Sequence, residues 1–244
     1  MFELSWVKTA FWDLLFPSLC LGCSAEGDIL CSACLRGLMG RTALPACLGC
    51  GFLVPGGKRI PAGRTCRSCR AKSSIYAFLA PLNYEDGVVR GLIHSLKYRH
   101  LHPAGKILGE MLANYLRSWG FLTSAQARSS VILTAIPLHP ARERVRGFNQ
   151  SVLIARGLAG KLNLELEEEA LGRVKKTKPQ TGLNSEERKK NVWESFAILK
   201  PGLVKGKTIV LVDDVATTGA TLEEAARVLK GAGAQRVWAV TVAH

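Results

Sequence analysis

The stretch from Thr208 to Glu223 constrains the fold more than any other part of the sequence. It reads Thr-Ile-Val-Leu-Val-Asp-Asp-Val-Ala-Thr-Thr-Gly-Ala-Thr-Leu-Glu. The branched aliphatic run from Ile209 to Val212 is typical of a strand that is buried on both faces of a parallel sheet. Two aspartates are expected at the carboxyl end of this strand, and the apolar spacing from Leu222 onward predicts a helix. The stretch therefore predicts a strand, a turn of small residues and a helix.

The expected turn suits an anionic ligand. A turn of small residues at a helix N-terminus directs several N–H groups at one point, where the helix dipole favours negative charge. Thr217, Thr218 and Thr221 add hydroxyl donors. Asp213 and Asp214 suit sugar hydroxyls, or a magnesium ion held through water. These groups together predict a ribose 5-phosphate site. The turn is not a P-loop, because no Gly-Lys-Ser/Thr triplet closes it. The alternative is an ordinary strand–turn–helix unit with an acidic turn.

The run Val-Leu-Val-Asp-Asp-Val-Ala-Thr-Thr-Gly-Ala-Thr resembles the phosphoribosyl pyrophosphate (PRPP) motif of type I phosphoribosyltransferases. The resemblance implies a catalytic role for Asp213 and Asp214. It also implies that PRPP is bound by the residues that follow them, namely Val215, Ala216, Thr217, Thr218, Gly219, Ala220 and Thr221.

All eight cysteines fall in the first part of the chain, in four C-x-x-C pairs. Such pairs suit zinc, because both thiolates of a tight turn can meet one ion. Disulfides are the alternative, which the lack of a recognisable export signal disfavours. Pairing by proximity in the sequence gives two candidate zinc sites, although the spacing leaves a crossed arrangement open. The predicted ligands are Cys20, Cys23, Cys31 and Cys34 for one site, and Cys47, Cys50, Cys66 and Cys69 for the other.

Composition indicates a globular chain, whose positive charge points either to anionic partners or to simple solubility. The 244 residues allow one sizeable core and a small extra module, and the formal net charge is +14. No run of 18 apolar residues occurs, so we expect no membrane span and a cytoplasmic protein. Residues 1–16 read as a short amphipathic helix. Residues 41–70 contain six Arg or Lys and no Asp or Glu. This basic segment is either a nucleic-acid contact or the solvated surface of a structural zinc module.

Basic residues also follow a second predicted buried strand, from Val131 to Ile136. Ligands of open α/β sheets lie beyond the carboxyl ends of the strands, so Arg142 and Arg146 are candidates for binding a diphosphate. A basic, Pro- and Gly-containing segment at about 175–190, which includes Lys176, is expected to be mobile and to act as a lid over the same site. A solvated turn and a surface loop are the respective alternatives.

The arrangement of these parts is similar to the ComF family, which joins an N-terminal zinc ribbon to a type I phosphoribosyltransferase domain. Further matching residues include Leu96-Lys97-Tyr98, Ile136-Pro137-Leu138, Arg146-Gly147-Phe148-Asn149-Gln150 and Arg188. The resemblance implies a twisted parallel sheet flanked by helices, a diphosphate-binding loop after residue 136, and a role in DNA uptake during natural transformation. We expect a double zinc ribbon with an N-terminal helix in residues 1–72 and the phosphoribosyltransferase-like domain in residues 73–244.

Two functions are consistent with this sequence. The first is an enzyme that binds Mg²⁺ and PRPP and transfers the phosphoribosyl group to an acceptor, with loss of pyrophosphate. The second is a non-catalytic protein that binds single-stranded DNA and keeps the PRPP site for sensing or for backbone contacts. The cofactors expected are Mg²⁺ and one or two structural Zn²⁺ ions, because eight cysteines exceed the needs of a single zinc site.

Overall fold

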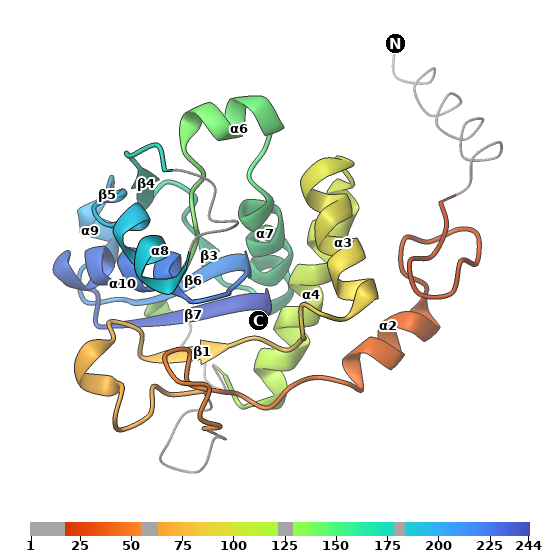
Figure 1. Ribbon diagram of the computed structural model, residues 1–244, viewed down its shortest axis with the longest axis horizontal. Helices are drawn as coiled ribbons and strands as arrows, with labels where there is room; N and C mark the ends of the chain where they lie inside the picture. Colours follow the sequence, from red (N-terminus) through yellow and green to blue (C-terminus); the bar gives the residue numbers. More distant parts are fainter. Residues whose placement is uncertain (1–17, 55–62, 122–128, 178–183) are drawn as a thin grey trace.

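A computed structural model of the protein describes residues 18–54, 63–121, 129–177 and 184–244 (Figure 1). The helix expected at 1–16 and the middle of the expected lid lie outside these residues. The elements described are α2 (Ser32–Met39), η1 (Arg70–Lys72), β1 (Ala77–Leu79), α3 (Gly87–Tyr98), α4 (His102–Ser118), β2 (Val131–Ala135), α6 (Pro140–Arg146), α7 (Gln150–Leu162), β3 (Glu165–Leu166), β4 (Leu171–Arg173), α8 (Ser185–Val192), β5 (Phe196–Ile198), α9 (Pro201–Val204), β6 (Thr208–Val215), α10 (Ala220–Gly231) and β7 (Arg236–Ala243).

The strands form a five-stranded parallel sheet in the order β1-β7-β6-β2-β3, and β4 and β5 form a separate antiparallel pair. Strand β6, which contains the predicted motif, lies at the centre of the larger sheet between β7 and β2. Its unbroken aliphatic run is buried on both faces, as expected of such a position. The predicted α/β fold with a parallel sheet is confirmed.

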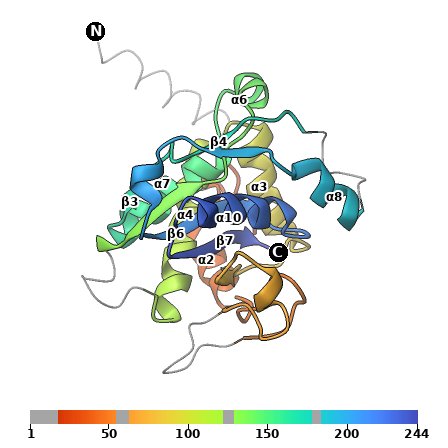
Figure 2. The same cartoon turned by 90° about the vertical axis from the view of Figure 1, so that its left-hand side faces the viewer.

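Helices cover both faces of the sheet (Figures 1 and 2). Side chains of α3, α4 and α7 pack with Leu133, Val210 and Val240 in one core, on one face. On the other face, α10 packs with Ile209, Leu211 and other strand residues in a second core. Successive residues of a strand point to opposite faces, so alternate positions of β6 supply the two cores.

Strand β6 is longer than the aliphatic run predicted. The parallel ladder with β7 continues through Asp213, which pairs with Thr241, to Val215, which pairs with Ala243. The two aspartates therefore lie within the last residues of the strand rather than after it. The neighbouring strand determines this difference, because β7 offers main-chain partners up to Ala243.

Local signals set most helix ends. The carboxylate of Asp86 accepts hydrogen bonds from the N–H groups of Val88 and Val89 and so caps the N-terminus of α3. A short helix, α6, stands where the resemblance implies a diphosphate-binding loop. His139 caps this helix through Nδ1, and Gly147 ends it at φ 81°, a left-handed conformation that glycine adopts at little cost.

The segment from Leu164 to Val174, which reads as one strand, is divided. Its first part is β3, at the edge of the large sheet, and its second part is β4, which pairs with β5. Three consecutive glutamates, Glu167 to Glu169, separate the two strands. Charged side chains of this kind are unfavourable in the buried interior of a sheet, so the chain turns there.

Candidate functional site

The candidate phosphate loop, residues 216–221, joins the end of β6 to the start of α10. Gly219 is the N-cap of α10 at φ 71°, and this left-handed residue turns the chain from strand into helix. The N–H of Ala216 donates to Ala243 O at 3.1 Å. The main-chain N–H groups of Thr217, Thr218 and Gly219 have no acceptor among the described residues. The loop therefore presents unpaired amides at the N-terminus of a 12-residue helix.

The remaining residues of the loop differ in exposure. Thr217 and Thr218 are exposed and Thr221 is half-buried, so their side chains can reach a ligand. Val215 is half-buried at the end of the strand, whereas Ala216 and Ala220 are buried in the core beneath α10.

The two aspartates are buried and each is held by a second element. Ser151 Oγ, on α7, donates to Asp213 Oδ1 at 2.8 Å, and the N–H of Asp214 donates to the same oxygen at 2.9 Å. Lys97, at the end of α3, forms an ion pair with Asp214. The Lys97 side chain is mostly buried against this carboxylate.

This environment changes the pKa of Asp213 and of Lys97. Burial, and then the neighbouring Asp214 carboxylate, raise the pKa of Asp213 to about 7. Burial lowers the pKa of Lys97, but the two aspartates raise it more, so that its net pKa lies above the ordinary value. At neutral pH the charge of Asp213 is therefore sensitive to any cation that approaches it.

A cationic group lies beside the aspartates. Arg173, at the end of β4, is only 8% exposed, and its Nη2 donates to Thr177 Oγ1 at 2.7 Å. Its Nε has no hydrogen-bond partner among the described residues. Burial, and then the Arg142 guanidinium, lower the pKa of Arg173, while Asp213 opposes this shift. Arg142 and Asp213 therefore both lie close enough to Arg173 to affect its pKa.

The second predicted arginine, Arg146, lies at the C-terminal end of α6. Its Nη1 donates to Gln150 Oε1 at 2.5 Å, and its guanidinium lies 5.6 Å from the centre of the Tyr98 ring. Tyr98 follows Lys97 on α3. Arg142 and Arg146 therefore both lie on α6, which follows the carboxyl end of β2.

The expected lid reaches the loop through α8. Nη1 of Arg188 donates to Thr217 Oγ1 at 2.8 Å, and Asn184 with Glu187 forms a capping box at the start of this helix. Lys176 is exposed after β4, and within the described residues it forms no hydrogen bond or ion pair with the loop. Residues 178–183 lie outside the described residues.

The cysteines form two groups, each containing four thiols within 4.8 Å of one another. The groups follow the pairing by proximity in the sequence. The sulfurs of Cys23 and Cys31 lie 3.8 Å apart and those of Cys50 and Cys66 lie 3.5 Å apart, well beyond the roughly 2.05 Å of a disulfide bond. We name the two groups cluster 1 (Cys20, Cys23, Cys31 and Cys34) and cluster 2 (Cys47, Cys50, Cys66 and Cys69).

Both clusters fit a tetrahedral zinc ion by their donor set and by their shape. A Cβ atom at Gly22 would lie 2.7 Å from Cys34 Sγ, and a Cβ atom at Gly49 would lie 3.2 Å from Cys69 Sγ. Main-chain N–H groups, that of Cys31 first, lower the pKa of Cys20 to about 6. The Ser68 hydroxyl, followed by the Cys69 amide, lowers the pKa of Cys66 to about 6. Each cluster therefore contains a thiol that favours the thiolate form needed for a metal ligand.

The turn between Cys47 and Cys50 of cluster 2 packs against the candidate phosphate loop through Leu48. A Cβ atom at Gly219 would lie 2.6 Å from the side chain of Leu48, which is the residue that follows Cys47. In the segment after Cys69, Ser73 Oγ donates to Glu223 Oε2 at 2.8 Å, and Ser74 N–H donates to the same carboxylate. Glu223 lies in the first turn of α10. The segment is therefore fixed to the helix that begins at the loop.

Four residues of the site were given no role from the sequence: Ser151, Lys97 as the partner of Asp214, Arg173 and Leu48. Ser151 and Lys97 reach the aspartates only through the packing of α7 and α3 on the sheet. The role of Arg173 could have been suspected from the sequence, because a single arginine ends the otherwise apolar run of β4. Leu48 stands inside a Cys-x-Gly-Cys turn, where no local pattern indicates a contact with a loop 171 residues later in the sequence (219 − 48 = 171).

Comparisons with known proteins show which sequences this chain is similar to. Residues 149–244 match the family model described as phosphoribosyl transferase domain. A DNA utilization protein, YhgH, of Escherichia coli (strain K12) is 31% identical over 231 residues, which cover 92% of this chain and 97% of that protein. Competence protein F of Haemophilus influenzae (strain ATCC 51907 / DSM 11121 / KW20 / Rd) is 25% identical over 227 residues, which cover 91% of this chain and 95% of that protein.

Among solved structures, the allosteric regulatory enzyme of purine biosynthesis is 25% identical, with a TM-score of 0.38, over 58% of this chain and 26% of that one. Among the helices of the described residues, none is long and apolar enough to cross a membrane.

Proposed function

The chain belongs to the ComF family, that of the DNA utilization and competence proteins, and on this premise we propose that it binds PRPP with Mg²⁺ and transfers the phosphoribosyl group. The observation that carries the proposal is the buried Arg173 guanidinium. It forms no ion pair with a described carboxylate, its Nε has no hydrogen-bond partner among the described residues, and Arg142 is close enough to lower its pKa. A buried guanidinium near a second cation is unfavourable unless an anion binds there, and a diphosphate supplies such an anion.

The candidate phosphate loop supports the same ligand. The unpaired amides of Thr217, Thr218 and Gly219 at the start of α10 suit the 5-phosphate of a ribose. One residue separates Asp214 from the start of the loop, and two residues separate Asp213 from it. At these positions the carboxylates would accept hydrogen bonds from the ribose hydroxyls. Phosphate, sugar and diphosphate would thus be bound by three adjacent parts of one edge of the sheet.

The two aspartates also suit magnesium. Carboxylate oxygens are ligands that Mg²⁺ prefers, and they commonly hold this ion through water together with the phosphates of a substrate. When bound, the ion would supply positive charge to the diphosphate. The pKa of about 7 for Asp213 fits this role, because a nearby cation favours the ionised carboxylate.

In the proposed reaction, the bond between the anomeric carbon and the diphosphate oxygen breaks, and its electron pair leaves with the diphosphate. A nucleophile of the acceptor then bonds to that carbon. The protein residues contribute position and charge: the loop fixes the 5-phosphate, the aspartates orient the ribose, and Arg142, Arg146 and Lys176 face the leaving group. Arg173 joins this set because it lies beside Arg142.

Calorimetry with PRPP and Mg²⁺ tests the binding step. We expect the Asp213→Ala/Asp214→Ala variant to lose measurable binding, whereas Glu165→Ala, an exposed carboxylate on the edge strand β3, retains it. Unchanged affinity in the double variant would falsify the assignment. Turnover is tested separately, by measuring pyrophosphate release from PRPP with nucleobases, amines and single-stranded DNA as acceptors.

We also propose that clusters 1 and 2 each hold one structural zinc ion. In each cluster, four thiols lie within 4.8 Å of one another and one of them has a lowered pKa, which is the usual ligand set of such sites. A reducing compartment, such as the cytoplasm, would keep these thiols available for metal. The measurement is metal content per chain, for which two zinc ions are expected and one or none would contradict the proposal.

The names of the relatives favour a function in DNA uptake or use, and we propose the same for this chain. A second candidate function is the binding of single-stranded DNA without phosphoribosyl transfer. The observation that favours it is the basic segment around the cysteines of cluster 2. Arg64, Arg67 and Arg70 are close to these cysteines in the sequence, and Arg67 and Arg70 are exposed. Competition between PRPP and an oligonucleotide for the protein would show whether the two ligands share a site.

A further inference from the structure

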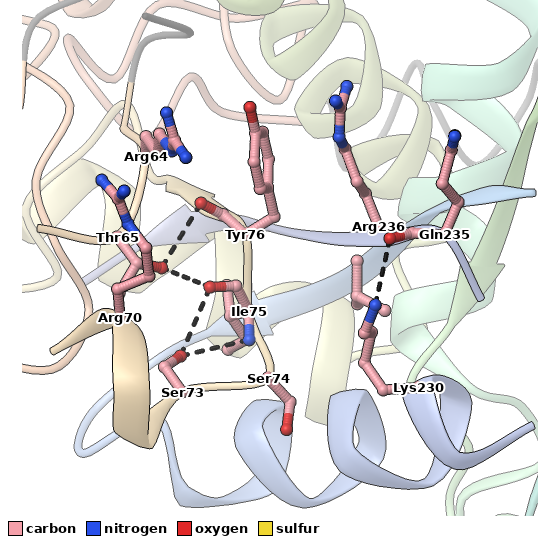
Figure 3. Close-up of a pocket in the computed structure, with 11 residues that line it drawn as sticks. Arg64, Thr65, Arg70, Ser73, Ser74, Ile75, Tyr76, Lys230, Gln235 and Arg236 are labelled. Atoms are coloured by element: carbon pink, nitrogen blue, oxygen red, sulfur yellow. Dashed lines mark hydrogen bonds between the residues drawn. The ribbon is translucent and has the colours of Figure 1, made fainter. Parts of the chain in front are cut away.

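A pocket of about 180 Å³ lies at the opposite edge of the sheet from the candidate phosphate loop (Figure 3). It is formed where the chain leaves cluster 2, at the start of β1 and β7, and beside the C-terminal end of α10. Its lining contains four cationic side chains and no carboxylate. The residues are Arg64, Thr65, Arg70, Ser73, Ser74, Ile75, Tyr76, Lys230, Gln235, Arg236 and Val237.

We infer that this pocket is a second phosphate-binding site, which takes a phosphate group carried by a nucleotide, either free or within a nucleic-acid strand. Parallel strands place the PRPP motif at their carboxyl ends, whereas the pocket lies at their amino ends, next to Arg236 at the start of β7. The two sites are therefore separate, and the inference does not depend on PRPP binding. It gives a location to the nucleic-acid binding considered above as a second candidate function.

Two of the arginines are held in position by one ring. The Arg64 guanidinium lies 5.1 Å from the centre of the Tyr76 ring and that of Arg236 lies 4.8 Å from it. Figure 3 shows the two side chains on opposite sides of the ring. Stacking on an aromatic ring leaves the N–H groups at the edge of a guanidinium free to donate. Tyr76 therefore fixes two donor forks without using their hydrogen bonds.

The donors of the pocket are largely unpaired. Arg64 Nε is buried and has no hydrogen-bond partner among the described residues. None of the four cations forms an ion pair with a described carboxylate. Glu223 lies near Ser73 and Ser74, but its carboxylate is bonded to those two residues. A buried polar group without a partner is unfavourable, so an anion in this pocket would stabilise the arrangement.

The lysine of the pocket is also fixed. Lys230 Nζ donates to the carbonyl oxygens of Ala234 and Gln235, each at 3.0 Å, and an ammonium group has three donors. One N–H of Lys230 therefore remains for a ligand. Together with Arg64 and Arg236, it gives the pocket donors from three separate side chains, and a phosphate, which has more acceptor oxygens than a carboxylate, can accept from more of them.

The size of the pocket limits the ligand. Pockets that enclose a drug-sized molecule have volumes of roughly 300–1,000 Å³, and this one has about 180 Å³. It therefore suits one phosphate group, with the rest of the nucleotide outside on the surface. The exposed Arg70, in η1, would extend the contact toward a neighbouring phosphate of a strand.

The test uses the full-length, metal-loaded protein and three probes: inorganic phosphate, a nucleoside 5′-monophosphate, and a labelled single-stranded oligonucleotide. The variant is Arg64→Ala/Arg236→Ala, and the control is Arg90→Ala/Lys161→Ala, which removes two exposed cations elsewhere. We expect the first variant to bind the oligonucleotide at least about tenfold more weakly, with a salt slope smaller by about two. The control should stay within about twofold of the unaltered protein, and PRPP affinity should be unchanged in both.

The other probes identify the source of the phosphate. A parallel loss of phosphate and mononucleotide binding would assign the site to a free nucleotide, whereas a loss confined to the oligonucleotide would assign it to a strand. Because the arginines pack on Tyr76, thermal unfolding should accompany the comparison, and Arg70→Glu provides a second, exposed variant that should weaken oligonucleotide binding. Folded variants that bind all three probes as the unaltered protein does, or an equal loss in the control, would overturn the inference.

Discussion

The hydroxyl of Ser151, on α7, donates a hydrogen bond to Asp213 Oδ1 at 2.8 Å, and both residues are buried. This bond links the helix that follows the arginine-bearing α6 to the central strand that bears the aspartates. It also opposes the effect of burial, because it lowers the pKa of Asp213 that burial raises. The acidity of the proposed PRPP site therefore depends on the position of a helix from another part of the chain.

The first prediction concerns Ser151→Ala. Loss of the hydroxyl should raise the pKa of Asp213 above about 7, so that less of the carboxylate is ionised at neutral pH. We expect PRPP affinity to fall about tenfold at pH 7 and to recover partly at pH 9. Calorimetry at several pH values measures the pH at which PRPP affinity is half-way between its low-pH and high-pH values, which we call the midpoint. Ser195→Ala is the control, because the buried Ser195 hydroxyl has no partner among the described residues. An unmoved midpoint in Ser151→Ala would contradict the role given to this bond.

The second prediction concerns stability and pH. Asp213 has a pKa of about 7 in the folded protein against an ordinary 3.8. Between about pH 4 and 7 the folded state therefore holds a proton that the unfolded chain has lost, and its contribution to stability falls as pH rises through this window. We expect Asp213→Asn to unfold at nearly the same urea concentration as the unaltered protein at pH 4. At pH 8 it should be more stable by on the order of 4 kcal/mol. An equal effect at the two pH values would show that Asp213 does not titrate in this way.

The third prediction concerns the contact between Gly219 and Leu48. Gly219→Ala should destabilise the fold by about 2–4 kcal/mol, because it adds left-handed strain (φ 71°) to a contact of 2.6 Å with Leu48. Gly206→Ala is a matched control, since Gly206 has φ 73° and no atom within 4 Å of an added Cβ. It should cost only about 1–2 kcal/mol.

Adding Leu48→Ala to Gly219→Ala should restore the part of the loss that is due to the contact. Urea unfolding of the two single variants and the double variant gives the coupling energy between these positions. Additive effects would mean that cluster 2 and the candidate phosphate loop do not touch in solution.

The fourth prediction separates the two cysteine clusters. Cys31→Ser and Cys66→Ser should each remove one of two bound zinc ions, as measured by metal content. Only Cys66→Ser should also weaken PRPP binding, by about tenfold, because Leu48 and the segment at Ser73 and Ser74 join cluster 2 to the loop and to α10. Equal PRPP affinity in both variants, with the metal lost as expected, would argue against this connection.

The sequence by itself determined the parts whose residues are neighbours in the chain. The unit of strand, loop and helix around Asp213 and Asp214 follows from local composition, and the grouping of the cysteines into two clusters follows from their spacing. The helix starts at Asp86 and near Pro103 were predictable for the same reason, because a cap is a contact over two or three residues.

Only the tertiary structure decided which residues surround those parts. Ser151 is 62 residues from Asp213 in the sequence, and Lys97 and Arg173 reach the aspartates from α3 and from the small second sheet. The length of β6 was likewise set by its neighbour β7, and the helix α6 was absent from the expected pattern. Contacts between distant segments arise when whole elements pack their apolar faces, and no local pattern records which polar side chains then meet.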